Sequence, residues 1–214
     1  MTTLVIIAKE PLPGRAKTRL HPPLSLEQAA EVAAASIQDT LAATRALPAT
    51  RRILFYQGDR LPANCEGYDV IAQTTGTLDE RLGDLFDEVD GPTVLIGMDT
   101  PQVTAADLLP AVTAWPHDID AWFGPAEDGG WWALGLREPR GDLIRGVAMS
   151  QGDTGALTLV RLAEAGLRVG RLRMLRDIDT IDDALSVARQ APHTSVASTL
   201  ARFGAGLELV GAHS

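Results

Sequence analysis

The amino-acid sequence predicts one α/β domain with a mixed, mostly parallel sheet. Over the first half of the chain, short apolar runs of strand length alternate with longer segments of helical periodicity. Such alternation is typical of parallel strands joined by right-handed crossovers. In the second half, two apolar runs lie on either side of the short stretch EDGG. This close pair of runs indicates that the sheet is mixed rather than wholly parallel.

The expected strands are the runs rich in β-branched, aromatic and other apolar residues. They cover residues 3–8, 52–56, 69–73, 93–97, 120–126, 131–136 and 168–175. The first, TLVIIA, is apolar throughout, as expected of a strand that is buried on both faces.

The expected helices are recognised by apolar spacing and by their start signals. They cover residues 24–44, 78–89, 104–113, 154–165 and 180–190. In the first helix, Ser25 is the expected N-cap, and Gln28 three residues later completes a capping box. After Ala191 the sequence shows no clear pattern, so we predict no further element there.

Composition restricts the classes of function. The chain has 214 residues, 45% hydrophobic and 22% charged, with a net charge of −9. An acidic chain without an extended basic face is not expected to bind nucleic acid. Cys65 is the single cysteine, which excludes an intrachain disulfide and fits a reducing compartment. Because no apolar run approaches the length of a membrane helix and the start lacks signal-peptide features, we expect a cytoplasmic protein with no membrane partner.

A basic loop follows the first strand. In AKEPLPGRAKTRL, the chain places both of its lysines, Lys9 and Lys17, together with Arg15 and Arg19. Ligands of open α/β sheets bind beyond the carboxyl ends of strands, and lysine and arginine both suit phosphate. The loop therefore predicts a phosphate cradle, although it matches neither the Walker pattern nor the dinucleotide fingerprint. The alternative is a solvated basic loop without a ligand.

Asp99, in IGMDTP, follows the expected strand 93–97. A carboxylate at the end of a buried strand is well placed to hold a hard divalent cation. The alternative is an aspartate that stabilises a turn. Thr104 already has the position of the next helix cap, which favours the first interpretation.

The stretch GPAEDGGWWALGL predicts an acceptor pocket. Glu127 and Asp128 precede Gly129 and Gly130, and the aromatic Trp131 follows at once. An acidic pair beside a flat ring suits a polar acceptor, and either acid can serve as a general base. The alternative is an ordinary hairpin turn.

Two more acids, Asp177 and Asp179, precede the last expected helix. Acids and a threonine at a helix start are stabilising in themselves, and Thr180 is the expected cap. The alternative is that one of them, Asp179, supplies a second metal ligand beside Asp99.

These motifs in this order resemble a bacterial family of GT-A-like nucleotide-diphospho-sugar transferases, or glycosyltransferases, some of them associated with arsenosugar biosynthesis. The resemblance covers residues 4–188 and includes QTTGTLDERL at residues 73–82. The segment AKTRL also resembles the loop of 2-phospho-lactate guanylyltransferases, which share their fold with molybdenum-cofactor guanylyltransferases. The resemblance implies a single-domain GT-A, Rossmann-like, three-layer α/β/α fold over residues 1–214 with a core at about residues 3–190.

The resemblance also implies a nucleotide substrate with Mg²⁺ or Mn²⁺ and roles for individual residues. Lys17, Asp99 and Asp128 would be catalytic, and Asp99 and Asp179 would hold the metal. The acceptor would contact Glu127, Asp128, Gly129, Gly130 and Trp131. The nucleotide and its phosphates would contact Ala8, Lys9, Pro13, Gly14, Arg15, Lys17, Arg19, Gln73 and Arg81.

Two stretches depart from the family pattern. Trp131 occupies a position where the family pattern has tyrosine, and MSQGDTGA, residues 149–156, replaces an expected tryptophan-serine-threonine segment. Both departures lie on the acceptor side, so the acceptor is expected to differ from that of the family.

The sequence favours a glycosyltransferase that moves a sugar from a nucleotide-sugar to a small acceptor. The first alternative is a nucleotidyltransferase that joins a nucleoside triphosphate to a small phosphorylated acid and releases pyrophosphate. The second is a nucleotide-binding domain without catalysis. The base, the sugar, the acceptor and the oligomeric state are left open by the sequence.

Overall fold

The computed structural model describes residues 2–113 and 115–207, and these residues form a seven-stranded sheet with the order β3-β2-β1-β4-β6-β5-β7. The strands are β1 (Thr3–Lys9), β2 (Arg51–Gln57), β3 (Asp69–Ala72), β4 (Thr93–Gly97), β5 (Ala121–Pro125), β6 (Trp131–Leu136) and β7 (Val169–Arg171). The predicted mixed, mostly parallel sheet is confirmed.

The direction of the strands defines one functional edge. Strands β1, β2, β3 and β4 are mutually parallel, β6 pairs antiparallel with both β4 and β5, and β7 is parallel to β5. The carboxyl ends of β1, β4 and β5 therefore lie at the same edge as the start of β6. The basic loop, Asp99 and the EDGG turn all leave the sheet at this edge.

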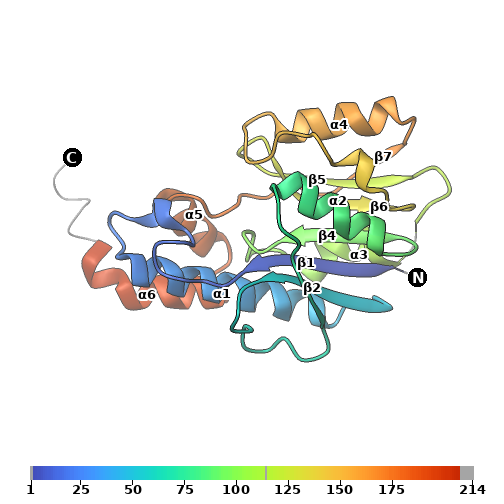
Figure 1. Cartoon of the computed structure of the whole chain (residues 1–214). Coiled ribbons are helices and arrows are strands. Elements are labelled where there is room, and N and C mark those ends of the chain that lie inside the picture. The colour runs from blue at the N-terminus through green and yellow to red at the C-terminus, as the bar shows by residue number, and fades with distance from the viewer. Residues whose placement is uncertain (1, 114, 208–214) are drawn as a thin grey trace.

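Helices cover both faces of the sheet (Figure 1). They are α1 (Leu26–Arg45), α2 (Leu78–Glu88), α3 (Ala105–Thr113), α4 (Thr154–Glu164), α5 (Ile181–Gln190) and α6 (Ser195–Leu207). Helices α1 and α3 share one apolar cluster with the sheet, and α2 and α4 share another. Within the described residues, no helix has both the length and the apolar character to cross a membrane.

Local start signals placed α1 correctly. The Ser25 hydroxyl accepts from the Gln28 backbone N–H, and the Gln28 side chain accepts from the Ser25 backbone N–H. Thr180 and Asp183 form the same reciprocal arrangement at the start of α5. These contacts satisfy backbone donors that a helix start otherwise leaves without partners.

Helix α6 corrects the prediction that the chain has no further element after Ala191. In Figure 1, α5 and α6 lie beside α1, at the end of the sheet opposite the start of β1. Val196 and Leu200 of α6 are buried in a cluster with residues of α1 and α5. The start of α6 is capped by Asp39 of α1, whose carboxylate accepts from the backbone N–H groups of Ser195 and Val196 at 2.8 and 3.0 Å. Thr194 adds a local cap, because its Oγ1 accepts from the Ala197 backbone N–H at 3.2 Å, and this start signal in the sequence was missed.

Strand β7 is shorter than the predicted strand 168–175. It ends at Arg171, although Leu172 and Leu175 still donate backbone hydrogen bonds to Phe123 and Pro125. A single bridge joins Ala126 to Leu175. The segment after Arg171 therefore follows β5 irregularly towards the carboxyl edge and carries residues 176–179 to that edge.

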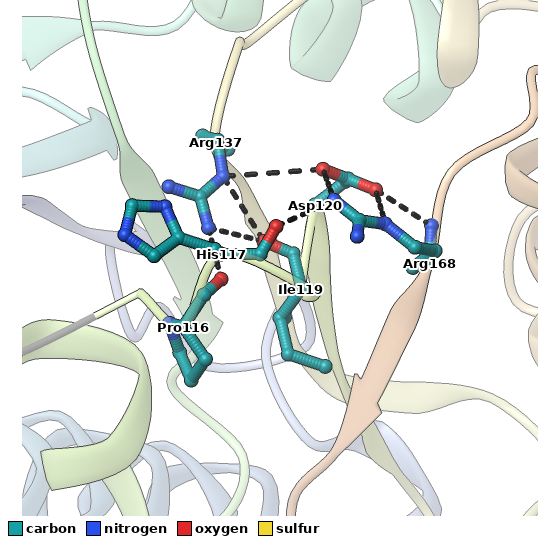
Figure 2. Close-up of polar contacts among 6 residues, drawn as sticks. All are labelled: Pro116, His117, Ile119, Asp120, Arg137 and Arg168. Carbon is teal, nitrogen blue, oxygen red and sulfur yellow. Dashed lines mark hydrogen bonds and ion pairs between the residues drawn. The ribbon is translucent and has the colours of Figure 1, made fainter.

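At the opposite edge, charged side chains join the ends of β5, β6 and β7 (Figure 2). Asp120 accepts from Arg168 Nε at 2.7 Å, and Arg168 also donates to the His117 carbonyl. Arg137 donates through Nε to the Ile119 carbonyl at 3.0 Å. Hydrogen bonds from Arg168 lower the pKa of Asp120 to about 2. The cluster lies at the edge opposite the carboxyl ends of the parallel strands and connects the ends of β5, β6 and β7.

Asp107 in α3 should contribute to stability in a pH-dependent way. Its side chain is 9% exposed and accepts from Arg173 at 2.7 and 2.9 Å and from the Thr104 N–H at 2.9 Å. Burial raises the pKa of Asp107, but the hydrogen bonds from Arg173 and Thr104 outweigh burial and hold the pKa below its usual range. The stabilisation is therefore present above about pH 4 and is lost as the pH falls through the lowered pKa.

We expect Asp107→Asn to lower the melting temperature at pH 7 by about 4–8 °C, the equivalent of about 2 kcal/mol for a charge-assisted contact. The difference from the wild type should shrink as the pH falls below about 4. Asp69→Asn is the matched control, because Asp69 pairs with Arg51 at 2.8 Å but is 60% exposed. Thermal unfolding followed by circular dichroism measures both, and equal effects of the two substitutions would contradict the interpretation.

Candidate active site

A cavity of about 440 Å³ opens at the carboxyl edge of the sheet. Its walls come from the basic loop after β1, the end of β4, the EDGG turn, the segment before α4 and the segment before α5. The predicted site residues that line it are Lys9, Arg15, Lys17, Arg19, Asp99, Asp128, Gly130, Trp131 and Asp179. Four motifs that are far apart in the sequence thus meet at one site.

The basic loop is held in a folded shape by its own backbone. The N–H groups of Arg15 and Ala16 donate to the Leu12 carbonyl at 3.0 and 3.1 Å. Gly14 has φ +73° and Lys17 has φ +50°. A left-handed backbone costs a residue other than glycine roughly 1–3 kcal/mol, and such strain is concentrated at functional sites. The loop therefore has a defined conformation that directs the Lys17 side chain.

Lys17 joins three segments of the site. Its Nζ lies 2.7 Å from Asp99 Oδ1, and it also donates to the Ile178 carbonyl. The Lys17 side chain is 7% exposed, whereas that of Asp99 is 46% exposed. The Ile178 N–H donates to the Asp99 carbonyl at 2.9 Å. Asp99 therefore presents its carboxylate to the cavity while its backbone and Lys17 fix its position.

Asp177 lies in the cavity, although the sequence favoured Asp179 as the second metal ligand. Burial raises the pKa of Asp177 to about 6, and the negative charges of Asp128 and Asp99 add to the effect. Asp179 also lines the cavity, but its carboxylate pairs with Arg19. The carboxylates that influence each other across the cavity are thus those of Asp99, Asp128 and Asp177.

These carboxylates are compatible with a magnesium or manganese ion. Among residues 2–113 and 115–207, no group of three or more His, Cys, Asp or Glu side chains has the arrangement to hold a metal alone. Mg²⁺ is commonly held by one or two carboxylates, with substrate phosphates and waters as its other ligands. Asp99 and Asp177, which repel each other as anions, provide donors of this kind.

The EDGG turn packs against the segment before α4. Asp128 accepts from the Gly130 N–H at 2.8 Å, and the Gly155 N–H donates to the Gly129 carbonyl at 2.9 Å. Glu127 does not line the cavity but pairs with Arg176 at 2.6 Å. Of the predicted acidic pair, the structure therefore brings Asp128 to the cavity and turns Glu127 to an ion pair.

Gly129 should tolerate no side chain. Its φ is +90°, and a Cβ there would lie 2.0 Å from the Gly152 carbonyl oxygen. We expect Gly129→Ala to push residues 150–155 away from the turn. The loss in free energy of unfolding should be well above the roughly 1–2 kcal/mol that a left-handed alanine costs by itself. Gly67→Ala is the control, since Gly67 has φ +85° with nothing within 4 Å. Thermal unfolding of both variants tests this, and equal losses would show that the contact with Gly152 is unimportant.

Gln73 and Arg81 lie outside the cavity lining. Gln73 Nε2 donates to the carbonyls of Ala8 and Phe55 at 2.9 and 3.0 Å, and its Oε1 accepts from Arg81 at 2.7 Å. The two side chains thus join the ends of β1 and β2 to α2. Pro13 and Gly14 likewise shape the loop without lining the cavity.

Sequence reasoning missed an apolar part of the wall, formed by Leu78, Leu82 and Met149. The two leucines belong to the helical stripe of α2. Thr100 was also missed; it lines the cavity, is 2% exposed, and its Oγ1 has no hydrogen-bond partner among the described residues. A buried hydroxyl of this kind is usually satisfied by water or ligand. The apolar spacing predicted the helix but could not show which leucines reach the cavity.

Comparison with solved structures confirms the fold. A protein of Desulfovibrio desulfuricans G20, provisionally named a nucleotide-diphospho-sugar transferase, is 26% identical, with a TM-score of 0.85 and coverage of 97% of each chain. CMP:2-keto-3-deoxy-manno-octonic acid synthetase, solved with CTP, is 12% identical, with a TM-score of 0.56 and coverage of 90% of this chain and 98% of that chain. A nucleotidyl transferase from Methanothermobacter is 19% identical, with a TM-score of 0.56 and coverage of 89% and 97%. The last two show likeness in fold alone.

The chain thus has the α/β fold of nucleotide-diphospho-sugar transferases. It belongs to the DUF2064 family, described as uncharacterized protein conserved in bacteria, whose model matches residues 39–151. A search of curated proteins finds no match.

Proposed function

We propose that this protein is a metal-dependent transferase that uses an activated nucleotide and moves a sugar from a nucleotide-sugar to a small acceptor. The observation that carries the proposal is the placement of charge in one cavity. Lys9, Arg15 and Lys17 line it from the loop after β1, and Asp99 and Asp128 line it from other segments. A diphosphate needs the cations, and an acceptor hydroxyl needs a base.

The residues then have distinct roles. Lys9, Arg15 and Lys17 bind the diphosphate and stabilise the charge that develops as it leaves. A divalent cation held by Asp99 with Asp177 would neutralise part of the same charge when bound. Asp177 is proposed as the second ligand because it lines the cavity where the charges of Asp99 and Asp128 act on it, whereas Asp179 pairs with Arg19.

In the transfer step, the acceptor hydroxyl oxygen forms a bond to the anomeric carbon of the sugar. The bond from that carbon to the diphosphate oxygen breaks, and its electron pair leaves with the nucleoside diphosphate. Asp128 accepts the hydroxyl proton and later releases it to water. Hydrogen bonding from the Gly130 N–H to Asp128 at 2.8 Å supports this role by fixing the carboxylate.

Nucleotidyl transfer is the second candidate, and one observation favours it. Four cationic side chains of one loop line the cavity, two of them, Lys17 and Arg19, in contact with Asp99 and Asp179, and this number of cations suits the three phosphates of a triphosphate. In that reaction the acceptor attacks the α-phosphorus and pyrophosphate leaves.

Product analysis separates the candidates. A thermal-shift screen of nucleotides and nucleotide-sugars with Mg²⁺ first finds the donor, since a ligand at a hundredfold excess over its Kd adds about 2.7 kcal/mol to stability. Release of nucleoside diphosphate from a nucleotide-sugar is expected for the first candidate. Release of pyrophosphate from a triphosphate would favour the second. Binding without either product would leave a nucleotide-binding domain.

A further inference from the structure

We propose that the acceptor is an uncharged or positively charged hydroxyl compound with an apolar face, and that phosphorylated or carboxylated acceptors bind more weakly. The inference rests on the proposed transferase function and extends it to the class of the second substrate. It follows from the distribution of charged and apolar side chains around the cavity.

The cations of the cavity come from one loop, and two of them contact aspartates of the lining: Lys17 lies 2.7 Å from Asp99, and Arg19 pairs with Asp179. Among the described residues that line the cavity, every Lys or Arg belongs to residues 9–19, and none is a histidine. Away from this loop, the charged lining residues are acids, including Asp128 and Asp177. Arg176 is close in sequence to Asp177 but does not line the cavity; it pairs with Glu127 at 2.6 Å and Asp183 at 3.5 Å.

The charged side chains of the lining affect which acceptors can bind. A donor diphosphate would take up the loop cations and the proposed divalent ion, so a second anion would lie beside Asp128, for which the described residues supply no Lys or Arg partner. Each like-charge contact at about 4 Å costs about 1 kcal/mol even at the dielectric constant of water, and more in a partly enclosed site. This arrangement disfavours acceptors that carry phosphate or carboxylate groups.

The cavity also has an apolar wall. It is formed by Trp131, Met149, Leu78 and Leu82. The Trp131 ring is held by a hydrogen bond from its Nε1 to Thr158 Oγ1 at 3.2 Å. A fixed ring beside aliphatic side chains suits the apolar face of an acceptor, whose hydroxyl then points to Asp128.

A set of matched probes tests the charge preference. Benzyl alcohol, its para-aminomethyl derivative and para-hydroxymethylbenzoate share a ring and a hydroxyl and differ in charge. Their Kd values are measured by NMR titration with Mg²⁺ and inorganic pyrophosphate present, so that the positive loop is blocked. The wild type is compared with Asp128→Asn and with Glu138→Gln, an equal charge change at an exposed residue that follows β6.

We expect the neutral and cationic probes to bind the wild type about tenfold tighter than the benzoate, a difference that follows from one or two like-charge contacts. Asp128→Asn should reduce this difference in Kd between the benzoate and the other two probes, and Glu138→Gln should leave the difference unchanged. The inference is overturned if the benzoate binds the wild type as tightly as the alcohol, a result that needs no variant. Failure of the proposed function would be seen separately, because the protein would then bind neither nucleotide nor pyrophosphate. That result does not depend on how the Kd values of the three probes rank.

Discussion

Replacing Asp99 with asparagine should abolish metal-dependent turnover, with a loss of at least about a hundredfold, the cost of removing one electrostatic contact to a transition state. Asp99 presents a half-exposed carboxylate to the cavity from the end of β4. Asparagine keeps the size of the side chain but removes the charge that a divalent cation requires. Initial rates over a range of Mg²⁺ concentrations measure the effect.

The structure also predicts that Asp99→Asn is less stable than the wild type. Removing the charge leaves Lys17, whose side chain is 7% exposed, without its carboxylate partner at 2.7 Å. We therefore expect the melting temperature to fall by about 3–8 °C. Adding Lys17→Met to Asp99→Asn should restore part of this loss without restoring activity, because the two residues form one pair.

Normal activity of Asp99→Asn at limiting Mg²⁺ would contradict the assignment. Asp99 would then be an aspartate that stabilises a turn, which is the alternative interpretation of the sequence. The metal site would have to be sought among Asp128, Asp177 and Asp179, which line the same cavity.

Local sequence signals predicted most of the fold because the corresponding interactions are local. The capping boxes that start α1 and α5 each use residues three positions apart. Strand β4 was predicted from its apolar run with the bounds that the structure has. Helix α6 was missed although Thr194 caps it locally; the rest of its capping comes from Asp39, a residue of another helix.

The same distinction applies to the candidate site. Residue type and position at strand ends brought Lys17, Asp99 and Asp128 into the prediction, and all three line one cavity. The partners of individual side chains could not be predicted, because they come from distant segments. Gln73 has a polar side chain next to a strand end, yet its amide is used by backbone carbonyls. The functional roles of these residues stay predictions.

Lys17→Met should lower the affinity for nucleotide and for inorganic pyrophosphate at least tenfold, because a charge-assisted contact contributes roughly 1.5–3 kcal/mol. From the sequence alone, Lys17 is expected to be a loop residue whose loss leaves the fold intact. The structure instead buries its side chain between Asp99 and the Ile178 carbonyl. Methionine is therefore chosen over alanine, since it retains most of the apolar stem that packs there.

Lys9→Met is the matched control, because it removes the only other lysine of the chain from the same loop. Lys9 is exposed at the end of β1 and lines the same cavity. Its loss should weaken binding less than the loss of Lys17, and the difference from the wild type should diminish as salt screens an exposed charge. Isothermal titration calorimetry at two salt concentrations measures both variants. If neither substitution changes the affinity for nucleotide or pyrophosphate, the loop is not a phosphate cradle, and the proposed transferase function loses the observation that carries it.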